Sequence, residues 1–380
     1  MGPNSYASAI NSLGVVVGAA QTNGTARAFI WRRRTGARYL PSVTGDWTAA
    51  GGINDRGDVV GVSQPDAVLW RNDGRIFRIP AGTLSQEPCE SVLFGAGLIN
   101  DSRLVVGGGA GDCDPSGFMY TWDASHLTTC HTSGCPNYTY VGFDVGAAGL
   151  TEQGMMVGAS GYYADPMAQP FTYMNGTFTW LPLLLDLPGV SVGGAEAVNR
   201  DGSLIVGWST KLIQAPYQTA NRAVEWFGPS HIVRDLTPRL PQPWDDSGAD
   251  SVNKAGTVLL HYYDYGTSTY TFRLRTPDGH LYPIDALIPY PGRWTSIQPF
   301  AINDNGVIIG EAMRNGTPRA VILTPIRPQP GTVPLARRAG PSAQRLIAPR
   351  GCLHSAAKHA PLSPRQALLM AAATGCASHL

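Results

Sequence analysis

Aromatic and acidic side chains recur in the variable stretches of this 380-residue chain, and these residue types could carry binding or catalysis. Trp and Tyr rings beside carboxylates bind sugars or protein surfaces when loops present them on a rigid scaffold. With a His, the same carboxylates could act as general acids and bases. Alternatively, the rings only cap the ends of elements, because Tyr and Trp favour half-buried positions. The candidate residues are Trp47, Tyr162, Tyr163, Asp165, Trp208, Trp244, Asp245, Asp246, His261, Tyr263, Asp264 and Trp294.

Standard catalytic and cofactor motifs are missing from the sequence. It contains no G-x-S-x-G, no H-E-x-x-H and no phosphate-binding glycine loop. The sequence has no C-x-x-C pair of the kind that binds zinc, so we expect neither a metal nor a cofactor. The tripeptide at residues 56–58 reads Arg-Gly-Asp, but its Gly belongs to a repeated turn. We therefore interpret this integrin-type motif as a coincidence.

The elements that must position the candidate residues come from a repeated segment. Seven times the chain reads apolar-Asn-x-x-Gly, then a short apolar run that usually ends in Gly, with Thr in place of Asn in the fourth copy. The copies lie about 43 to 54 residues apart, with repeats starting near residues 9, 52, 98, 149, 197, 251 and 301. Self-similarity at this period is typical of solenoids, propellers and repeat arrays.

Each repeat contains four short strand-like pieces rich in β-branched and aromatic residues. Asn-x-x-Gly suits a tight turn between the first two pieces, because only Gly enters the left-handed region cheaply. The predicted structural turn residues are Asn11, Gly14, Asn54, Gly57, Asn199, Gly202, Asn253, Gly256, Asn303 and Gly306. A four-stranded meander of this kind must stack on its neighbours to bury both faces, and such units are the blades of a β-propeller.

The sequence thus predicts an all-β fold, a seven-bladed β-propeller of four-stranded antiparallel blades spanning residues 1–325. An open β-solenoid or two β-sandwiches are the alternatives. The fourth piece is missing after the last repeat, so the last blade is incomplete unless residues 333–335 or 344–347 complete it. The tail, residues 326–380, is rich in Pro, Arg and Ala, and we expect it to be mostly disordered with a short helix over 364–374.

Composition restricts the partners. Charged residues make up 14% of the chain and the net charge is +1, which leaves no basic surface for nucleic acid. The apolar run at residues 367–373 is too short to span a bilayer, so we expect no membrane span. We expect a monomer that binds an unknown extracellular ligand, either a carbohydrate or a protein surface.

The cysteines point to an oxidising compartment. Four of the six interrupt repeats two and three, and loop cysteines clustered in this way can pair. The candidate disulfides are Cys130 to Cys135 and Cys89 to Cys113, with four free thiols in a reducing compartment as the alternative. The first residues carry no signal peptide, which disagrees with export unless the start is truncated.

The repeat resembles the HAF repeat of bacterial secreted proteins. The resemblance rests on Ala-x-x-Ile-Asn-x-x-Gly-x-Val-Val-Gly followed by Ala-Phe-x-Trp, and residues 9–40 and 301–325 match it best. It implies export, to the periplasm, cell surface or outside, and a propeller fold, but no catalytic residue. This chain has neither the signal peptide nor the membrane-spanning tail of many members, so a shifted reading frame after about residue 326 stays open.

The predicted fold separates two faces. Tight turns joining pieces one to two and three to four would share one face, and long joins of two to three and four to one would share the other, with the aromatic candidates. We expect a non-catalytic binding module; a propeller enzyme acting on polysaccharide and a structural array are the alternatives. Converging acidic and His side chains with shifted pKa values would favour the enzyme, and an aromatic shelf alone would favour binding.

Overall fold

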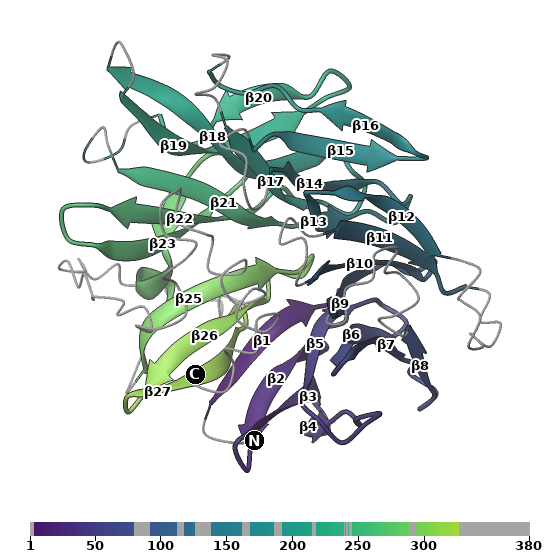
Figure 1. The fold of residues 1–380 in the computed structure, drawn as a ribbon. Coiled ribbons are helices and arrows are strands. Elements are labelled where there is room, and N and C mark those ends of the chain that lie inside the picture. Colours follow the sequence, from purple (N-terminus) through teal and green to yellow (C-terminus); the bar gives the residue numbers. More distant parts are fainter. Residues whose placement is uncertain are drawn as a thin grey trace.

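The computed structural model describes residues 4–79, 92–111, 118–125, 138–161, 168–185, 192–214, 218–238, 240, 242, 245–288 and 294–326. Seven antiparallel sheets in chain order form a ring, which confirms the predicted seven-bladed β-propeller (Figure 1). The first strand of every blade lies innermost and contacts the first strands of both neighbouring blades. The predicted disulfides and the tail from residue 327 lie outside the described residues.

The first three blades each contain four strands. Their bounds are β1 Ser5–Ile10, β2 Val16–Thr22, β3 Thr25–Arg32 and β4 Gly36–Tyr39 in blade 1; β5 Thr48–Ile53, β6 Val59–Ser63, β7 Asp66–Trp70 and β8 Ile76–Ile79 in blade 2; and β9 Val92–Ile99, β10 Leu104–Gly111, β11 Phe118–Asp123 and β12 Tyr138–Phe143 in blade 3.

Blades 4 to 6 are also four-stranded, whereas blade 7 has three strands among the described residues. Their bounds are β13 Val145–Leu150, β14 Met156–Ser160, β15 Pro170–Met174 and β16 Thr177–Trp180; β17 Gly193–Val198, β18 Leu204–Gln214, β19 Gln218–Phe227 and β20 Ile232–Asp235; β21 Asp246–Val252, β22 Val258–Asp264, β23 Thr269–Arg275 and β24 Leu281–Pro283; and β25 Trp294–Ile302, β26 Ile308–Arg314 and β27 Thr317–Leu323. A 3-10 helix, Ile284–Leu287, follows β24.

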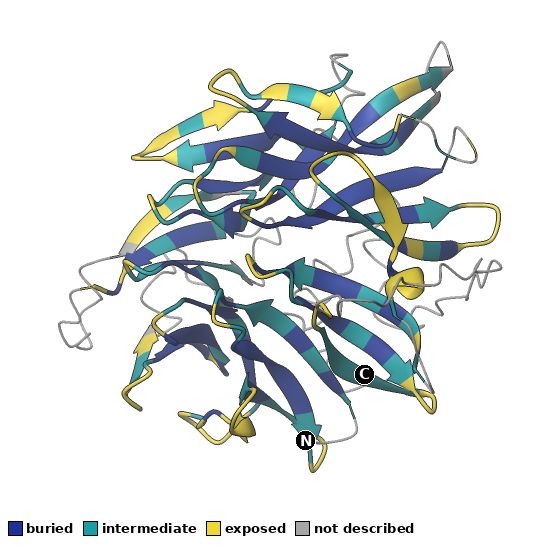
Figure 2. Ribbon diagram, turned by 180° about the vertical axis from the view of Figure 1, so that it is seen from behind, coloured by how far each residue is buried: buried dark blue, intermediate teal, exposed yellow. Residues whose placement is uncertain are grey.

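The core is divided into seven apolar clusters, one at each interface between neighbouring blades, including that between blades 7 and 1. Each cluster combines the apolar runs of second and third strands with inner-strand residues of the next blade. Because these runs face neighbours on both sides, they are apolar throughout rather than alternating. Figure 2 shows the buried residues along the inner and middle strands, and exposed residues at the turns and outer strands.

Glycine ends the apolar run because the inner strand passes very close to it. Every inner strand carries a β-bulge, and the main chain next to the bulge approaches the second strand. A Cβ placed on Gly18 would lie 2.0 Å from the Tyr6 carbonyl oxygen, and one on Gly158 would lie 1.8 Å from the Gly146 oxygen. The recurrent Gly is thus a requirement of blade geometry.

The ring closes without a strand exchanged between the termini among the described residues. Blade 7 packs directly on blade 1, where Ala320 N donates to Ser5 Oγ at 3.1 Å and Asn303 Nδ2 donates to Asn11 O at 2.9 Å. All seven residues of β27 are half-buried, because no described strand covers its outer edge. Blade 7 is therefore incomplete within the described residues, and the two candidate strands at 333–335 and 344–347 lie outside them.

One expectation about the faces is wrong in part. The joins of second to third strand are not uniformly long: in blades 1, 2 and 7 they are two-residue hairpins, at residues 23–24, 64–65 and 315–316. Asn23 and Asn315 take positive φ there, as Asn-Gly turns require. The second-to-third joins of blades 1, 2 and 7 therefore add no loop of more than two residues to that face.

Candidate functional site

The Asn-x-x-Gly turns lie at one end of the channel, which we call the turn end, and the opposite end is called the loop end. Repeated hydrogen bonds hold these turns together. The Asn carbonyl accepts from the Gly N–H in each turn, as for Gly14 N to Asn11 O at 3.0 Å. The turn glycines have φ between 72° and 87°, and Arg103 takes φ 68° where Gly is replaced. Asp58 of the Arg-Gly-Asp tripeptide is 1% exposed and bonded to Arg103 Nε at 2.8 Å, so it is unavailable to a partner.

The repeated Asn also links neighbouring blades, a role beyond the turn itself. Its Oδ1 accepts a main-chain N–H of its own turn, while its Nδ2 donates to the carbonyl of the equivalent residue in the next blade. These five residues, the asparagine ladder, are Asn11, Asn54, Asn100, Asn253 and Asn303. The ladder runs unbroken from blade 6 through blades 7, 1, 2 and 3 to Thr151 in blade 4.

The ladder is interrupted at blades 4 and 5, where an ion cluster replaces it. Thr151 has no side-chain amide to donate to the next blade. Asn199 Nδ2 instead donates to Ser203 Oγ in its own blade at 3.0 Å. The neighbouring Arg200 reaches across the ring, with Nη1 to Asp55 Oδ2 and Nη2 to Asp101 Oδ2 at 2.5 Å each.

The same Nη2 lies 3.4 Å from Glu152 Oε1, so Arg200 of blade 5 contacts blades 2, 3 and 4 together. We call Arg200, Asp55, Asp101 and Glu152 the Arg200 cluster. Partial burial raises the pKa of Glu152, and the Arg200 guanidinium with the Ser12 N–H and hydroxyl outweighs burial to lower the pKa of Asp55. The cluster thus ties the turns of blades 2 to 5 together across the turn end.

Acidic and His side chains converge partway along the channel in blades 5 and 6. The bulged inner-strand residues there are carboxylates, Glu196 and Asp250, and both are buried. Asp250 holds the His261 ring, with Nδ1 at 2.8 Å from Oδ1 and 3.0 Å from Oδ2. Trp208 Nε1 donates to Glu196 Oε1 at 3.2 Å.

Glycines on the inner strand make room for these rings. A Cβ on Gly248 would lie 2.5 Å from His261 Cε1, and one on Gly194 would lie 2.8 Å from Trp208 Nε1. Burial opposes protonation of His261, but the nearby carboxylates of Asp250, Glu196 and Asp246 outweigh it and raise the pKa of the imidazole. Since Nδ1 faces Asp250, Nε2 is the ring nitrogen available to a ligand.

A group of three tyrosines, the tyrosine shelf, lies beside His261 toward the loop end: Tyr263, Tyr265 and Tyr270. Tyr263 packs edge-on against Tyr265 and tilted against Tyr270, with ring centroids 4.8 Å apart in both pairs. Tyr265 is 48% exposed and donates its hydroxyl to Asp246 Oδ2 at 2.7 Å. Burial raises the pKa of Asp246, and Tyr270 also packs edge-on against His261 at 5.9 Å.

The structure brings some of the predicted site residues together. Asp246, His261 and Tyr263 lie in one cluster, and Trp208 reaches it through Glu196. Trp294 packs in the same apolar interface as Tyr270, with its ring under the Arg314 guanidinium at 5.2 Å.

Other candidates have local roles. Asp264 Oδ1 accepts from Thr267 N at 3.0 Å within a turn, Trp47 O accepts from Gln64 N at 3.2 Å, and Asp245 O accepts from buried Arg222 at 2.7 Å. Tyr162, Tyr163, Asp165 and Trp244 lie outside the described residues.

Sequence reasoning missed Glu196, Asp250, Tyr270 and Glu311 as site residues. The first two occupy bulge positions, and a bulge moves a side chain out of the simple strand alternation. A signal was nonetheless present: the two bulges are acidic in repeats five and six, where the other repeats have Ser, Gly, Ala or Phe.

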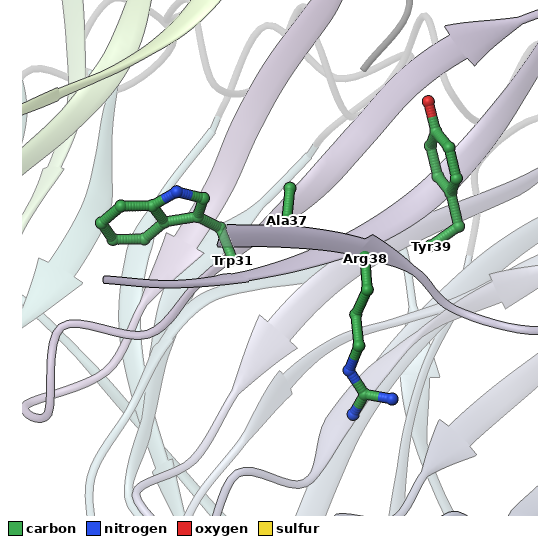
Figure 3. Close-up of a pocket in the computed structure, with 4 residues that line it drawn as sticks. All are labelled: Trp31, Ala37, Arg38 and Tyr39. Carbon is green, nitrogen blue, oxygen red and sulfur yellow. The ribbon is translucent and has the colours of Figure 1, made fainter. Parts of the chain in front are cut away.

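A separate depression lies on the outer edge of blade 1, away from the channel. Trp31, Ala37, Arg38 and Tyr39 line it, and Figure 3 shows Arg38 pointing to the opposite side of the strand from Ala37 and Tyr39. Its volume is about 370 Å³. The Tyr39 hydroxyl lies 2.7 Å from Thr22 Oγ1, and no converging titratable groups occur among these four residues.

Among the described residues, no three His, Cys, Asp or Glu side chains are arranged so that they could hold a metal ion. The same residues include no helix that is long and apolar enough to cross a membrane.

Comparisons with known proteins show weak structural similarity only. No family model matches the sequence, and no curated protein matches it. Prolyl oligopeptidase B from Galerina marginata, solved with a hydrolysis and macrocyclization substrate, is similar with a TM-score of 0.47 and 10% identity over 80% of this chain. Porphyromonas gingivalis dipeptidyl peptidase 4 is similar with a TM-score of 0.27 and 11% identity over 78%. The chain spans about 40% of the length of both proteins.

Proposed function

We propose that the protein is a secreted or surface-exposed binding module without catalytic activity, and that its ligand is a carbohydrate bound at the loop end of the channel. The observation that carries this proposal is the tyrosine shelf beside buried carboxylates. Ring faces stack on the apolar faces of sugars, and carboxylates accept hydrogen bonds from sugar hydroxyls. Export is supported by the resemblance of the repeat to a family of secreted proteins.

A glycan array followed by calorimetry with the best ligand tests the proposal. Tyr265→Ala removes the most exposed ring of the shelf and should weaken binding at least tenfold. Tyr39→Ala is a matched control, because Tyr39 is 40% exposed and its hydroxyl also has a partner at 2.7 Å, but it lies on the outer strand of blade 1. Equal affinity of the two variants and the unchanged protein would contradict the shelf as the binding site.

A hydrolase is the second candidate function, and the Asp250–His261 pair favours it. A carboxylate that fixes Nδ1 leaves Nε2 as a general base, which is the arrangement of many hydrolases. Against it, ring N–H groups already occupy the buried carboxylates of both Asp250 and Glu196. Glycoside hydrolysis usually needs two carboxyl groups free to flank the scissile bond. Release of reducing ends from a polysaccharide panel, lost in His261→Gln, would favour the enzyme.

A further inference from the structure

Glu311 occupies the same place in blade 7 as the site residues in blades 5 and 6. It follows Gly310, whose Cβ would lie 2.0 Å from the Gln298 carbonyl oxygen, and it pairs with Gln298 of the inner strand. Trp208 and His261 hold the equivalent register opposite Gly194 and Gly248. Three consecutive blades thus present a polar or aromatic side chain at one level of the channel.

Glu311 is half-buried, yet its carboxylate makes no hydrogen bond or ion pair within the part of the chain that the structure describes. Burial raises its pKa to about 7. Glu311 lies near the phenol of Tyr6 in blade 1, where it helps burial to raise the pKa of that hydroxyl to about 12. A buried carboxylate without a partner destabilises the fold, so it is a residue that a ligand could satisfy.

Buried carboxylates also lie in the two preceding blades, 5 and 6. His261 faces the carboxylates of Asp250, Glu196 and Asp246, and the phenol of Tyr270 is influenced by Asp250 and Asp246. Arg314, on the same strand as Glu311, packs over the Trp294 ring at 5.2 Å, and Arg222 is 3% exposed. The Nη1 of Arg222 donates to the main-chain carbonyls of Asn221 and Asp245. Arg222 is therefore committed to the fold, which favours a ligand that carries its own positive charge.

Open space adjoins the main chain on the other side of the ring. A Cβ added to Gly95 or to Gly97, on the inner strand β9, would meet no atom within 4 Å. Blades 2 to 4 carry Val62, Gly108 and Ala159 at the level that Trp208, His261 and Glu311 hold in blades 5 to 7. Blades 2 to 4 therefore leave space at this level of the channel. The polar and aromatic side chains of blades 5 to 7 lie on the other side of that space.

We propose that the carbohydrate bound at this site carries a protonated amine, as in oligomers of glucosamine, and that Glu311 receives the ammonium group. This inference rests on the proposed function. An ammonium donates to a buried carboxylate with a charge-assisted bond, and tyrosine faces attract cations. Uronic acid oligomers carry the opposite charge and would meet the carboxylates of Glu196, Asp246, Asp250 and Glu311.

Calorimetry with three probes of equal length tests the ligand class: glucosamine oligomers, N-acetylglucosamine oligomers and galacturonic acid oligomers. We expect the unchanged protein to bind the amine at least tenfold more tightly than the acetylated oligomer and the acidic oligomer not at all. Glu311→Gln should abolish the tenfold preference, since it removes the charge and keeps the shape. The control Asp278→Asn removes an exposed carboxylate at a turn of the other face and should preserve the preference.

The outcomes separate this inference from the function on which it rests. Equal binding of amine and acetylated oligomers, still weakened by Tyr265→Ala, would overturn the amine proposal and leave the carbohydrate site in place. Binding of no sugar by the unchanged protein would overturn both. A preference for amine that survives Glu311→Gln would overturn the role of Glu311. Thermal unfolding of each variant verifies that the fold is intact before binding is measured.

Discussion

The two ends of the channel differ in how they use the same repeat. At the turn end, equivalent residues of successive blades make equivalent contacts, as in the asparagine ladder, and the one deviation, Arg200, links four blades. At the loop end, equivalent positions carry three different side chains: Trp208 donates to Glu196, His261 contacts Asp250, and Glu311 has no hydrogen-bond partner among the described residues. Positions that keep the same residue type from blade to blade build the ring. Positions at the level of Trp208, His261 and Glu311 differ between blades, and these could serve a ligand.

The largest expected effect tests whether the ladder holds neighbouring blades together. Asn54→Ala removes two buried hydrogen bonds, from Asp58 N to Oδ1 at 2.9 Å and from Nδ2 to Asn100 O at 3.0 Å, and leaves their partners unsatisfied. We expect a loss of about 3 kcal/mol in the free energy of unfolding, measured by urea denaturation.

Asn54→Thr separates the two bonds, because Thr151 shows that a Thr hydroxyl can still accept the turn N–H, from Met155 at 3.0 Å. This variant should lose only the link between blades, at about 1 kcal/mol. Equal losses for Ala and Thr would mean that the link between blades contributes everything and the turn bond nothing.

A smaller effect is expected at the single deviation of the turn end. Arg200→Met keeps the aliphatic stem and leaves Asp55, Asp101 and Glu152 facing one another without a cation. The Arg200 side chain is 37% exposed, so solvent screens the cluster and we expect a loss of about 2 kcal/mol, reduced in high salt.

Arg75→Met is the matched control, because Arg75 pairs with Asp73 at 2.7 Å on the exposed surface, where solvent screens the pair and its loss should leave the free energy of unfolding almost unchanged. Two variants of equal stability would show that Arg200 has no special role at the turn end.

The turn end was largely predictable from the sequence, and the loop end was not. A turn needing positive φ strongly favours Gly, so the turn roles of Gly14 and Gly57 can be predicted from the sequence alone. The blade period follows from the same spacing. The second role of Asn54 was hidden, because a side chain that reaches the next blade leaves no mark on the local pattern.

At the loop end the acid that orients His261 lies eleven positions earlier, on another strand. Gly248 can be recognised as part of the site only once the position of the His261 ring, which a Cβ at Gly248 would touch, is known. The bulge that turns Asp250 toward the ring depends on the pairing of two strands rather than on a motif. Contacts of this kind are set by register, which the order of residues alone does not specify.

The last and smallest expected effect concerns protonation of His261. It tests whether the imidazole at the loop end is charged in the folded protein. Asp250, Glu196 and Asp246 raise the pKa of His261 above its ordinary value of 6.5, and Tyr270 packs on the ring. A raised pKa in the folded state stabilises the protein fully below pH 6.5, and that stability is lost as pH rises through the folded pKa.

Glu311 would obscure this trend, because a carboxyl whose pKa is raised from 4.5 to about 7 also makes stability fall as pH rises between those values. The measurement therefore compares Glu311→Gln with the double variant Glu311→Gln/His261→Gln by urea denaturation from pH 5.5 to 8.5. Stability of the single variant should fall with pH across that range more steeply than that of the double variant. Parallel curves would mean that His261 has the same pKa in the folded and unfolded states, and a single variant whose stability rises with pH relative to the double variant would mean that the fold keeps His261 neutral.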